Sequence, residues 1–259
     1  MGGDIIDSEE WLRGIVIRVE EEPRGKRKAS DWMDSIYFVD FDFTISRDDV
    51  WDAIVKESAL KEWEEEVRRF LDGEISSRTF NQRLAAAVRT RESVAREVVL
   101  AIGIDPTFHD FVRWIEKNGS PMLIVSDGYD YYIRLLLEQE GLGHLTYYCN
   151  QLVWTETGIQ VQFPLLNEAC EQDMAHCKCQ HILPHAGRRR VYIGDGVSDY
   201  CAARRCEVIY AKRNLLDYCR AESVECIPFT NFHDVMAEEE QRRQNGKTVS
   251  QVRMETRPR

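Results

Sequence analysis

Long apolar runs are missing from the sequence, and none approaches the about 20 residues that a helix needs to cross a bilayer. The N-terminus, MGGDIIDSEEWLRG, lacks the basic start and apolar centre of a secretory signal. It also fails the N-myristoylation pattern, because Ile6 stands where Ser or Thr is required. We therefore expect a cytoplasmic protein with no membrane partner.

Positive charge is also scarce. The chain carries 34 Lys and Arg against 45 Asp and Glu, which gives a formal net charge of −11. This balance argues against nucleic acid as a partner. The eight cysteines do not suggest a disulfide framework, because in a cytoplasmic chain of 259 residues they are more typical of reduced thiols or metal ligands.

Charged segments flank a region of alternating strands and helices. Residues 1–34 contain the run EEEPRGKRK, and residues 237–259 are rich in charged and polar side chains, so we expect an N-terminal extension and a solvated C-terminal tail. The apolar pattern predicts strands and a hairpin. The strands are Ile36–Phe41, Met122–Val125, Arg190–Ile193, Glu207–Tyr210 and Cys226–Phe229, and the hairpin joins Leu152–Trp154 to Ile159–Phe163. Helical patterns between these strands indicate an α/β fold with a parallel sheet.

One helical block interrupts this alternation directly after the first strand. Residues 48–102 carry apolar side chains at helical spacing, beginning with Val50, Trp51 and Ile54. We therefore predict a core domain formed by residues 35–47 and 103–236, with residues 48–102 as a helical insert.

Polar clusters follow three of the predicted strands. They are Asp40-Phe41-Asp42-Phe43-Thr44, Ser126-Asp127-Gly128 and Gly194-Asp195-Gly196-Val197-Ser198-Asp199. Alternate residues of a strand share a face, so Asp40 and Asp42 would repel each other unless a cation or a proton intervened. Ligands of open α/β sheets bind beyond the carboxyl ends of the strands, where all three clusters are expected to meet.

Carboxylates gathered in this way suit Mg²⁺, which prefers oxygen ligands and typically neutralises phosphate in enzymes. Ser126 and the backbone N–H groups of Asp127 and Gly128 could donate to phosphate oxygens at a helix N-terminus. A fixed cation would complete the site. Lys178 is the candidate, with Lys212 and the arginines at 188–190 as nearby alternatives.

The motif set Asp-x-Asp-x-Thr, a strand-end Ser, a Lys and Gly-Asp-x-x-x-Asp resembles that of the haloacid dehalogenase superfamily of phosphatases. The resemblance covers roughly residues 35–232 and implies a Rossmann-like parallel sheet flanked by helices, with a small helical cap inserted after the first strand. It implies a phosphatase that acts on a small phosphorylated metabolite. Asp40 would be the nucleophile that becomes an aspartyl phosphate, and Asp42 would serve as acid and then base.

The same resemblance implies roles for the other motif residues. Thr44 would orient the loop, and Ser126 and Lys178 would bind the transferring phosphoryl group. Mg²⁺ would bind the Asp40 carboxylate, the Asp42 backbone carbonyl and Asp195. Asp199 would be a ligand or an indirect support.

One residue departs from the family pattern. The family usually has Gly after the second Asp, and this chain has Phe43, which could alter the turn or protrude toward the substrate. The helical insert is typical of the phosphoserine-phosphatase-like subgroup. The segments SDGYDYYI and RNLLDYCRAES, and the Cys-rich stretch around Lys178, resemble the phosphatases of methionine salvage. Asp49, at the start of the insert, is the candidate for substrate contact.

Other functions remain open at this stage. The chain could be a phosphoserine or phosphocholine phosphatase, a phosphotransferase that uses the same aspartyl phosphate, or a phosphate-binding scaffold with weak activity. The cluster Cys170, His176, Cys177, Cys179 and His181 offers thiolate and imidazole ligands for zinc, although it lacks a clear second Cys pair. Reduced buried cysteines are the alternative.

Overall fold

The computed structural model describes residues 34–58, 63–156, 158–170 and 172–255. Within these ranges, seven strands form one sheet with the order β4-β3-β2-β1-β5-β6-β7. All neighbouring pairs are parallel except β3 and β4. The strands are β1 Ser35–Val39, β2 Met122–Tyr129, β3 Tyr147–Thr155, β4 Gly158–Gln162, β5 Arg189–Gly194, β6 Val208–Ala211 and β7 Ile227–Pro228. The predicted parallel α/β sheet is confirmed.

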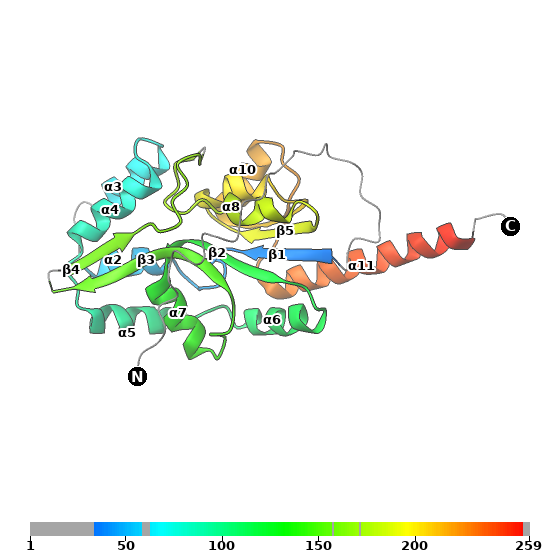
Figure 1. Ribbon diagram of the computed structural model, residues 1–259, viewed down its shortest axis with the longest axis horizontal. Helices are drawn as coiled ribbons and strands as arrows, with labels where there is room; N and C mark the ends of the chain where they lie inside the picture. Colours follow the sequence, from blue (N-terminus) through cyan, green and yellow to red (C-terminus); the bar gives the residue numbers. More distant parts are fainter. Residues whose placement is uncertain (1–33, 59–62, 157, 171, 256–259) are drawn as a thin grey trace.

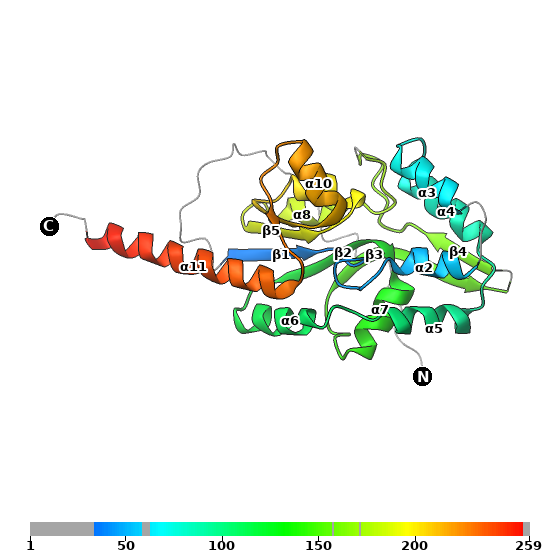
Figure 2. The same cartoon turned by 180° about the vertical axis from the view of Figure 1, so that it is seen from behind.

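Helices cover both faces of the sheet (Figures 1 and 2). Helices α5, α6 and α7 lie on one face, and α8 and α10 lie on the other (Figure 1). The α-helices are α2 Val50–Glu57, α3 Trp63–Leu71, α4 Ser77–Ala87, α5 Glu92–Ile102, α6 Thr107–Lys117, α7 Asp130–Gln139, α8 Cys179–Ile182, α9 Tyr200–Ala203, α10 Arg213–Ala221 and α11 Phe232–Glu255. Short 3₁₀ turns occupy Leu183–His185 and Val197–Asp199. No helix in the described ranges is long and apolar enough to cross a membrane.

Strand β1 lies at the centre of the sheet, and all five of its residues are buried. Strands buried on both faces read as continuous apolar runs, which is why Ser35–Val39 lacks an alternating pattern. Strands β2 and β5 flank β1 in parallel, so the three carboxyl ends meet at one edge. The predicted polar clusters stand at this edge.

Helices α2 to α5 stand between β1 and β2 in the chain, where the sequence predicts a helical insert. Asp49 starts α2 by accepting the backbone N–H of Asp52 at 2.8 Å, which satisfies one of the free donors of the first turn. Helices α3 and α4 lie at the end of the molecule where β4 forms the sheet edge (Figure 1). Helices α2, α3 and α4 contribute side chains to the same cavity as Asp40 and Asp195, which follow the carboxyl ends of β1 and β5.

Two expectations at strand boundaries need correction. Strand β2 does not end at Val125 but continues to Tyr129, with a register shift between these residues. Ser126, Asp127 and Gly128 thus lie within a strand and not at the N-terminus of a helix. The predicted hairpin is present as β3 and β4, but β3 begins earlier, because its first half pairs with β2.

The expected solvated tail at 237–259 is wrong at its beginning. Helix α11 runs through this boundary from Phe232 to Glu255, and Glu239 is fully buried. The Glu239 carboxylate accepts two hydrogen bonds from Arg189 at 2.8 Å and one each from Tyr37 and Tyr210. The charged residues that follow position 237 therefore include one member of a buried ion pair, Glu239. The predicted extension at 1–34 lies outside the described residues, except for Asp34.

Candidate active site

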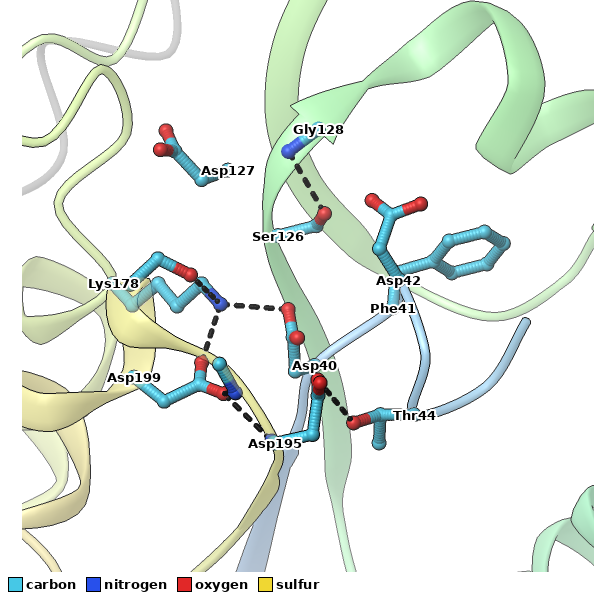
Figure 3. Close-up of polar contacts among 12 residues, drawn as sticks. Asp40, Phe41, Asp42, Thr44, Ser126, Asp127, Gly128, Lys178, Asp195 and Asp199 are labelled. Carbon is cyan, nitrogen blue, oxygen red and sulfur yellow. Dashed lines mark hydrogen bonds and ion pairs between the residues drawn. The ribbon is translucent and has the colours of Figure 1, made fainter. Parts of the chain in front are cut away.

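The Lys178 ammonium joins two of the predicted clusters (Figure 3). Its Nζ donates to Asp40 Oδ1 at 2.6 Å, to Asp199 Oδ1 at 2.5 Å and to Ser198 Oγ at 3.0 Å. All three charged side chains are buried. Burial by itself lowers the pKa of Lys178, but the carboxylates of Asp199 and Asp40 raise it more, so the group stays an ammonium. Lys178 is therefore the cation that contacts Asp40 and Asp199, whereas the arginines at 188–190 pair with Asp34, Glu239 and Glu207.

Asp199 is held by a complete set of donors. Its Oδ1 accepts from Lys178 and from the Tyr192 hydroxyl at 2.5 Å, and its Oδ2 accepts the backbone N–H groups of Asp195 and Gly196 at 2.9 Å. A carboxylate offers about four lone-pair positions. Asp199 therefore fixes Lys178 and the following loop, and it has little capacity left for another ligand.

Asp195 lies near Asp40, and its carboxylate has fewer contacts with donors than that of Asp199. Thr44 Oγ1 donates to its Oδ1 at 3.2 Å, and Arg213 Nε lies 3.3 Å from its Oδ2. Burial and the neighbouring Asp199 raise the pKa of Asp195 to about 7. A raised pKa means that the surrounding protein does not fully neutralise this carboxylate.

Phe43 occupies a backbone conformation that favours glycine. Its φ is +54°, and Arg213, which has a φ of +50°, places its guanidinium over the Phe43 ring at 3.6 Å. Such conformations are costly for a residue with a side chain. The cation–π contact offsets part of that cost and links the Asp42–Thr44 turn to Arg213.

Asp42 points away from the Lys178 cluster, as Figure 3 shows. Its Oδ1 accepts the backbone N–H of Val50 at 2.9 Å, and its Oδ2 accepts the Tyr132 hydroxyl at 2.8 Å. Burial raises the pKa of Asp42 to about 6, although both hydrogen bonds oppose the rise. The two aspartates of the first motif therefore occupy different environments.

Strand β2 supplies the third cluster. Ser126 Oγ accepts the backbone N–H of Gly128 at 3.0 Å, so this amide already has an acceptor. The Asp127 side chain accepts from the Ser77 hydroxyl, from Asn150 at 3.2 Å and from the His176 backbone N–H at 2.6 Å. Asp127 thus ties α4 and the segment before Lys178 to β2.

A cavity of about 300 Å³ opens beside these side chains. Asp40, Asp42, Ser126, Asp195 and Asp49 all line it. Helices of the insert supply an apolar part of the wall, formed by Trp51, Val67, Phe70, Leu71 and Phe80. This volume is at the small end of ligand pockets, which suits a compact substrate.

Burial raises the pKa of Asp49 well above its usual value, and the nearby carboxylates of Asp52 and Asp42 add to the rise. Asp49 lines the cavity and also caps α2, and its predicted contact with the substrate stays a prediction.

The described residues contain one set of three acidic, His or Cys side chains whose ligand atoms all lie within 4.8 Å of one another. The set is Asp40, Asp195 and Asp199, and all three residues are buried. Mg²⁺ binds oxygen ligands at about 2.0–2.1 Å, so ligand oxygens on opposite sides of the ion stand about 4.2 Å apart. The oxygen donor set and the incompletely neutralised Asp195 fit such a cation. The Asp42 side chain is not part of this set.

The predicted Cys/His cluster does not form a comparable set in the described residues. His176 and His181 face each other, with 2.8 Å between their Nε2 atoms, and His176 Nδ1 lies 2.6 Å from the Ser126 carbonyl. Burial lowers the pKa of His176 to about 4 and that of His181 to about 3, so both imidazoles are neutral. The zinc hypothesis gains no support from this geometry.

Sequence reasoning missed four side chains of the site. Ser198 lies inside a motif and could have been noticed, because its hydroxyl is one residue from Asp199. Tyr132 and Arg213 lie in the segments SDGYDYYI and RNLLDYCRAES, and Tyr192 lies in no motif. Only the fold brings these three side chains to the carboxylates that they contact.

Comparisons with known proteins agree with this geometry. A family model described as "Putative Phosphatase" matches residues 35–216. A relative from Bacillus cereus (strain ATCC 10987 / NRS 248), named 2-hydroxy-3-keto-5-methylthiopentenyl-1-phosphate phosphatase, is 27% identical over 206 residues, which is 78% of this chain and 94% of the relative. A relative of the same name from Bacillus mycoides (strain KBAB4) has the same identity and coverage.

Solved structures of phosphoserine phosphatase share the fold. One, an analogue of the phospho-aspartyl intermediate, has a TM-score of 0.63 and 17% identity over 78% of this chain and 97% of that chain. A substrate-bound complex has the same TM-score and identity and covers 83% of this chain and 99% of that chain. The chain therefore belongs to the "Putative Phosphatase" family, whose model matches residues 35–216, and its fold is that of phosphatases of the haloacid dehalogenase superfamily.

Proposed function

We propose that the chain hydrolyses a small phosphomonoester through an aspartyl phosphate on Asp40. The observation that carries this proposal is the pairing of two aspartates with different environments. Asp40 lies 2.6 Å from the Lys178 ammonium, while Asp42 is turned away and has a pKa of about 6. A carboxylate paired with a cation is a ready nucleophile, and a carboxyl with a pKa near neutrality can donate and accept a proton.

Each side chain then has a defined task. Asp40 Oδ2 attacks phosphorus, because Oδ1 is held by Lys178. Asp42 protonates the departing alkoxide and later takes a proton from the attacking water. Lys178 and the Ser126 hydroxyl hold the transferring phosphoryl group, and Asp199 keeps Lys178 in position.

Mg²⁺ is the proposed cofactor, held by Asp40, Asp195 and the backbone carbonyl of Asp42. When bound, it would neutralise charge on the phosphate oxygens. Asp199 would support this site indirectly, because its oxygens already accept four hydrogen bonds.

We further propose that helices α2 to α5 act as a small cap and that the substrate is 2-hydroxy-3-keto-5-methylthiopentenyl-1-phosphate. Support comes from the names of the relatives and from the cavity wall. Val67, Phe70 and Phe80 offer an apolar surface for a methylthio group. Trp51 Nε1 and the Tyr129 hydroxyl have no hydrogen-bond partner among the described residues, so both could donate to substrate oxygens. The cytoplasmic location stays a prediction.

A second candidate is a phosphate ester with a cationic head, such as phosphocholine. Asp49 and Asp52 line the same cavity, and burial together with the charge of Asp52 raises the pKa of Asp49, so a cationic group would be favourable beside it. A quaternary ammonium group beside Trp51 and Tyr129 would supply that charge and contact aromatic faces.

Two measurements test these proposals. Phosphate release from p-nitrophenyl phosphate should stop with EDTA, return with Mg²⁺ and fall by at least 10³-fold in Asp40→Asn, because that variant lacks the nucleophile. Equal activity of wild type and Asp40→Asn would reject the mechanism. The ratio of kcat/KM for the methylthio substrate, phosphoserine and phosphocholine decides the substrate. Preference for phosphocholine would favour the second candidate.

A further inference from the structure

Four cysteine side chains contact one another in succession, and two of them are sequence neighbours of Lys178. Cys170 contacts Cys177, Cys177 contacts Cys179, and Cys179 Sγ lies 3.0 Å from Cys201 Sγ. None of the eight cysteines, all within the described ranges, forms a disulfide. The sequence drew attention to three of these residues as zinc ligands, and the fold adds Cys201 from a distant segment.

The contact between Cys179 and Cys201 suits oxidation better than metal binding. Two thiolates on one Zn²⁺ ion would stand about 3.8 Å apart, given Zn–S bonds of about 2.3 Å and tetrahedral angles. The observed separation of 3.0 Å is shorter, and no third ligand atom of the described residues completes a site with them. A disulfide needs about 2.05 Å, so the two sulfurs are within about 1 Å of bonding distance.

Both cysteines lie close in sequence to charged residues of the proposed active site. Cys179 directly follows Lys178 and begins α8, while Cys201 lies in α9, two residues after Asp199. The sulfur contact and the Lys178–Asp199 ion pair therefore join the same two segments. Cys179 is buried, but Cys201 is partly exposed and gives solvent access to the pair.

We propose that Cys179 and Cys201 form an oxidisable thiol pair whose disulfide switches off the phosphatase. The oxidant is hydrogen peroxide. The Cys201 sulfur attacks a peroxide oxygen, the O–O bond breaks, and a sulfenic acid and one water form. The Cys179 sulfur then attacks the sulfenic sulfur, the S–O bond breaks, and a second water leaves with the Cys179 proton. Two electrons pass from the thiols to the peroxide, and a dithiol reverses the reaction by exchange.

Loss of activity follows from the geometry of the two segments. Closing the gap by about 1 Å draws α8 toward α9 and displaces Lys178 relative to Asp40. A misplacement of about 1 Å at a reacting group can cost about 10²-fold in rate. We therefore expect kcat/KM of the oxidised protein to fall by at least tenfold. This inference uses only the phosphatase activity of the family, and it does not depend on which phosphate ester is the natural substrate.

The test treats the reduced full-length protein with hydrogen peroxide. Peptide mapping without reductant should find one major cross-link, between Cys179 and Cys201, and activity on p-nitrophenyl phosphate should fall and return with dithiothreitol. Cys201→Ser should keep its activity in peroxide, and Cys201→Ala provides a second variant if serine harms folding. Cys226→Ser is the matched control, because it removes a thiol of the separate Cys219–Cys226 contact and should stay sensitive.

Several outcomes would overturn the proposal. They are a different mapped pair, no cross-link at all, a mapped cross-link with full activity, or equal inactivation of wild type and Cys201→Ser. Mapping needs no activity, so it still decides the cross-link if the proposed aspartyl-phosphate mechanism fails.

Discussion

The buried Glu239 carboxylate offers the clearest prediction on stability. It accepts four hydrogen bonds, two from Arg189, one from Tyr37 and one from Tyr210, and none of its surface is exposed. Glu239→Gln keeps the shape of the side chain but removes the carboxylate charge that pairs with the buried Arg189 guanidinium. Breaking a buried ion pair in this way costs about 3–5 kcal/mol in the free energy of unfolding. Because 1 kcal/mol shifts Tm by about 2–4 °C in a domain of this size, Tm should fall by about 6–20 °C.

Glu238→Gln is the matched control. Glu238 precedes Glu239 on α11 and pairs with Arg242 one turn later at 2.6 Å, and the side chains of Glu238 and Arg242 are about one-third exposed. Such a pair contributes about 0–1 kcal/mol. Urea unfolding at pH 7 compares the variants. A Glu239→Gln protein within 1 kcal/mol of wild type would refute the reasoning, because the buried charge would then have no energetic weight.

The pH dependence gives an independent check on the same residue. Burial alone raises the pKa of Glu239, but its hydrogen bonds and charge interaction with Arg189 lower it below the ordinary 4.5. A carboxylate whose folded-state pKa is lowered stabilises the fold fully above the unfolded-state value, and this contribution is lost as pH falls through the folded-state value. Below about pH 4.5, wild type should therefore lose more stability than Glu239→Gln, which has no such group to protonate.

Two further predictions concern the site itself. Tyr132→Phe should lower kcat by roughly tenfold or more, because a hydrogen bond to a charged group such as Asp42 contributes about 1.5–3 kcal/mol. Tyr131→Phe, which removes a hydroxyl on the same helix with a contact of only 3.4 Å, should stay within about twofold of wild type, and equal losses in both would count against the Asp42 contact. In a double-mutant cycle by urea unfolding, Arg213→Ala should cost about 0.5–1 kcal/mol less in a Phe43→Gly background than in wild type. Additive effects would show that the ring contact is unimportant.

The sequence predicted well which edge of the sheet brings the polar clusters together, because each cluster directly follows an apolar run in the sequence. Asp40 and Asp195 directly follow β1 and β5, and Ser126 follows the apolar part of β2, so parallel pairing places the three residues at one edge. Asp49 was proposed as a substrate contact because it stands at the start of the insert, and the structure adds that it caps α2. Lys178 required the family resemblance, because no local rule distinguishes it from Lys212.

What the sequence could not predict depends on contacts between distant segments. The charge run at 237–243 looks solvated, and only the buried Arg189 explains why Glu239 enters the core. The contact between Cys179 and Cys201 joins residues 22 positions apart. Phe43 stands where the family usually has glycine, and its conformation is supported by Arg213 from a helix far along the chain. Such pairings arise from packing and leave no periodic signal.

The central claim is that the Asp40 carboxylate forms a covalent bond with the transferred phosphoryl group. Quenching the enzyme in acid during turnover, followed by peptide mass mapping, tests this most directly. We predict one added phosphate on the peptide that contains Asp40, absent from Asp40→Asn. A phosphate found on another residue, or none under conditions in which wild type turns over, would contradict the account.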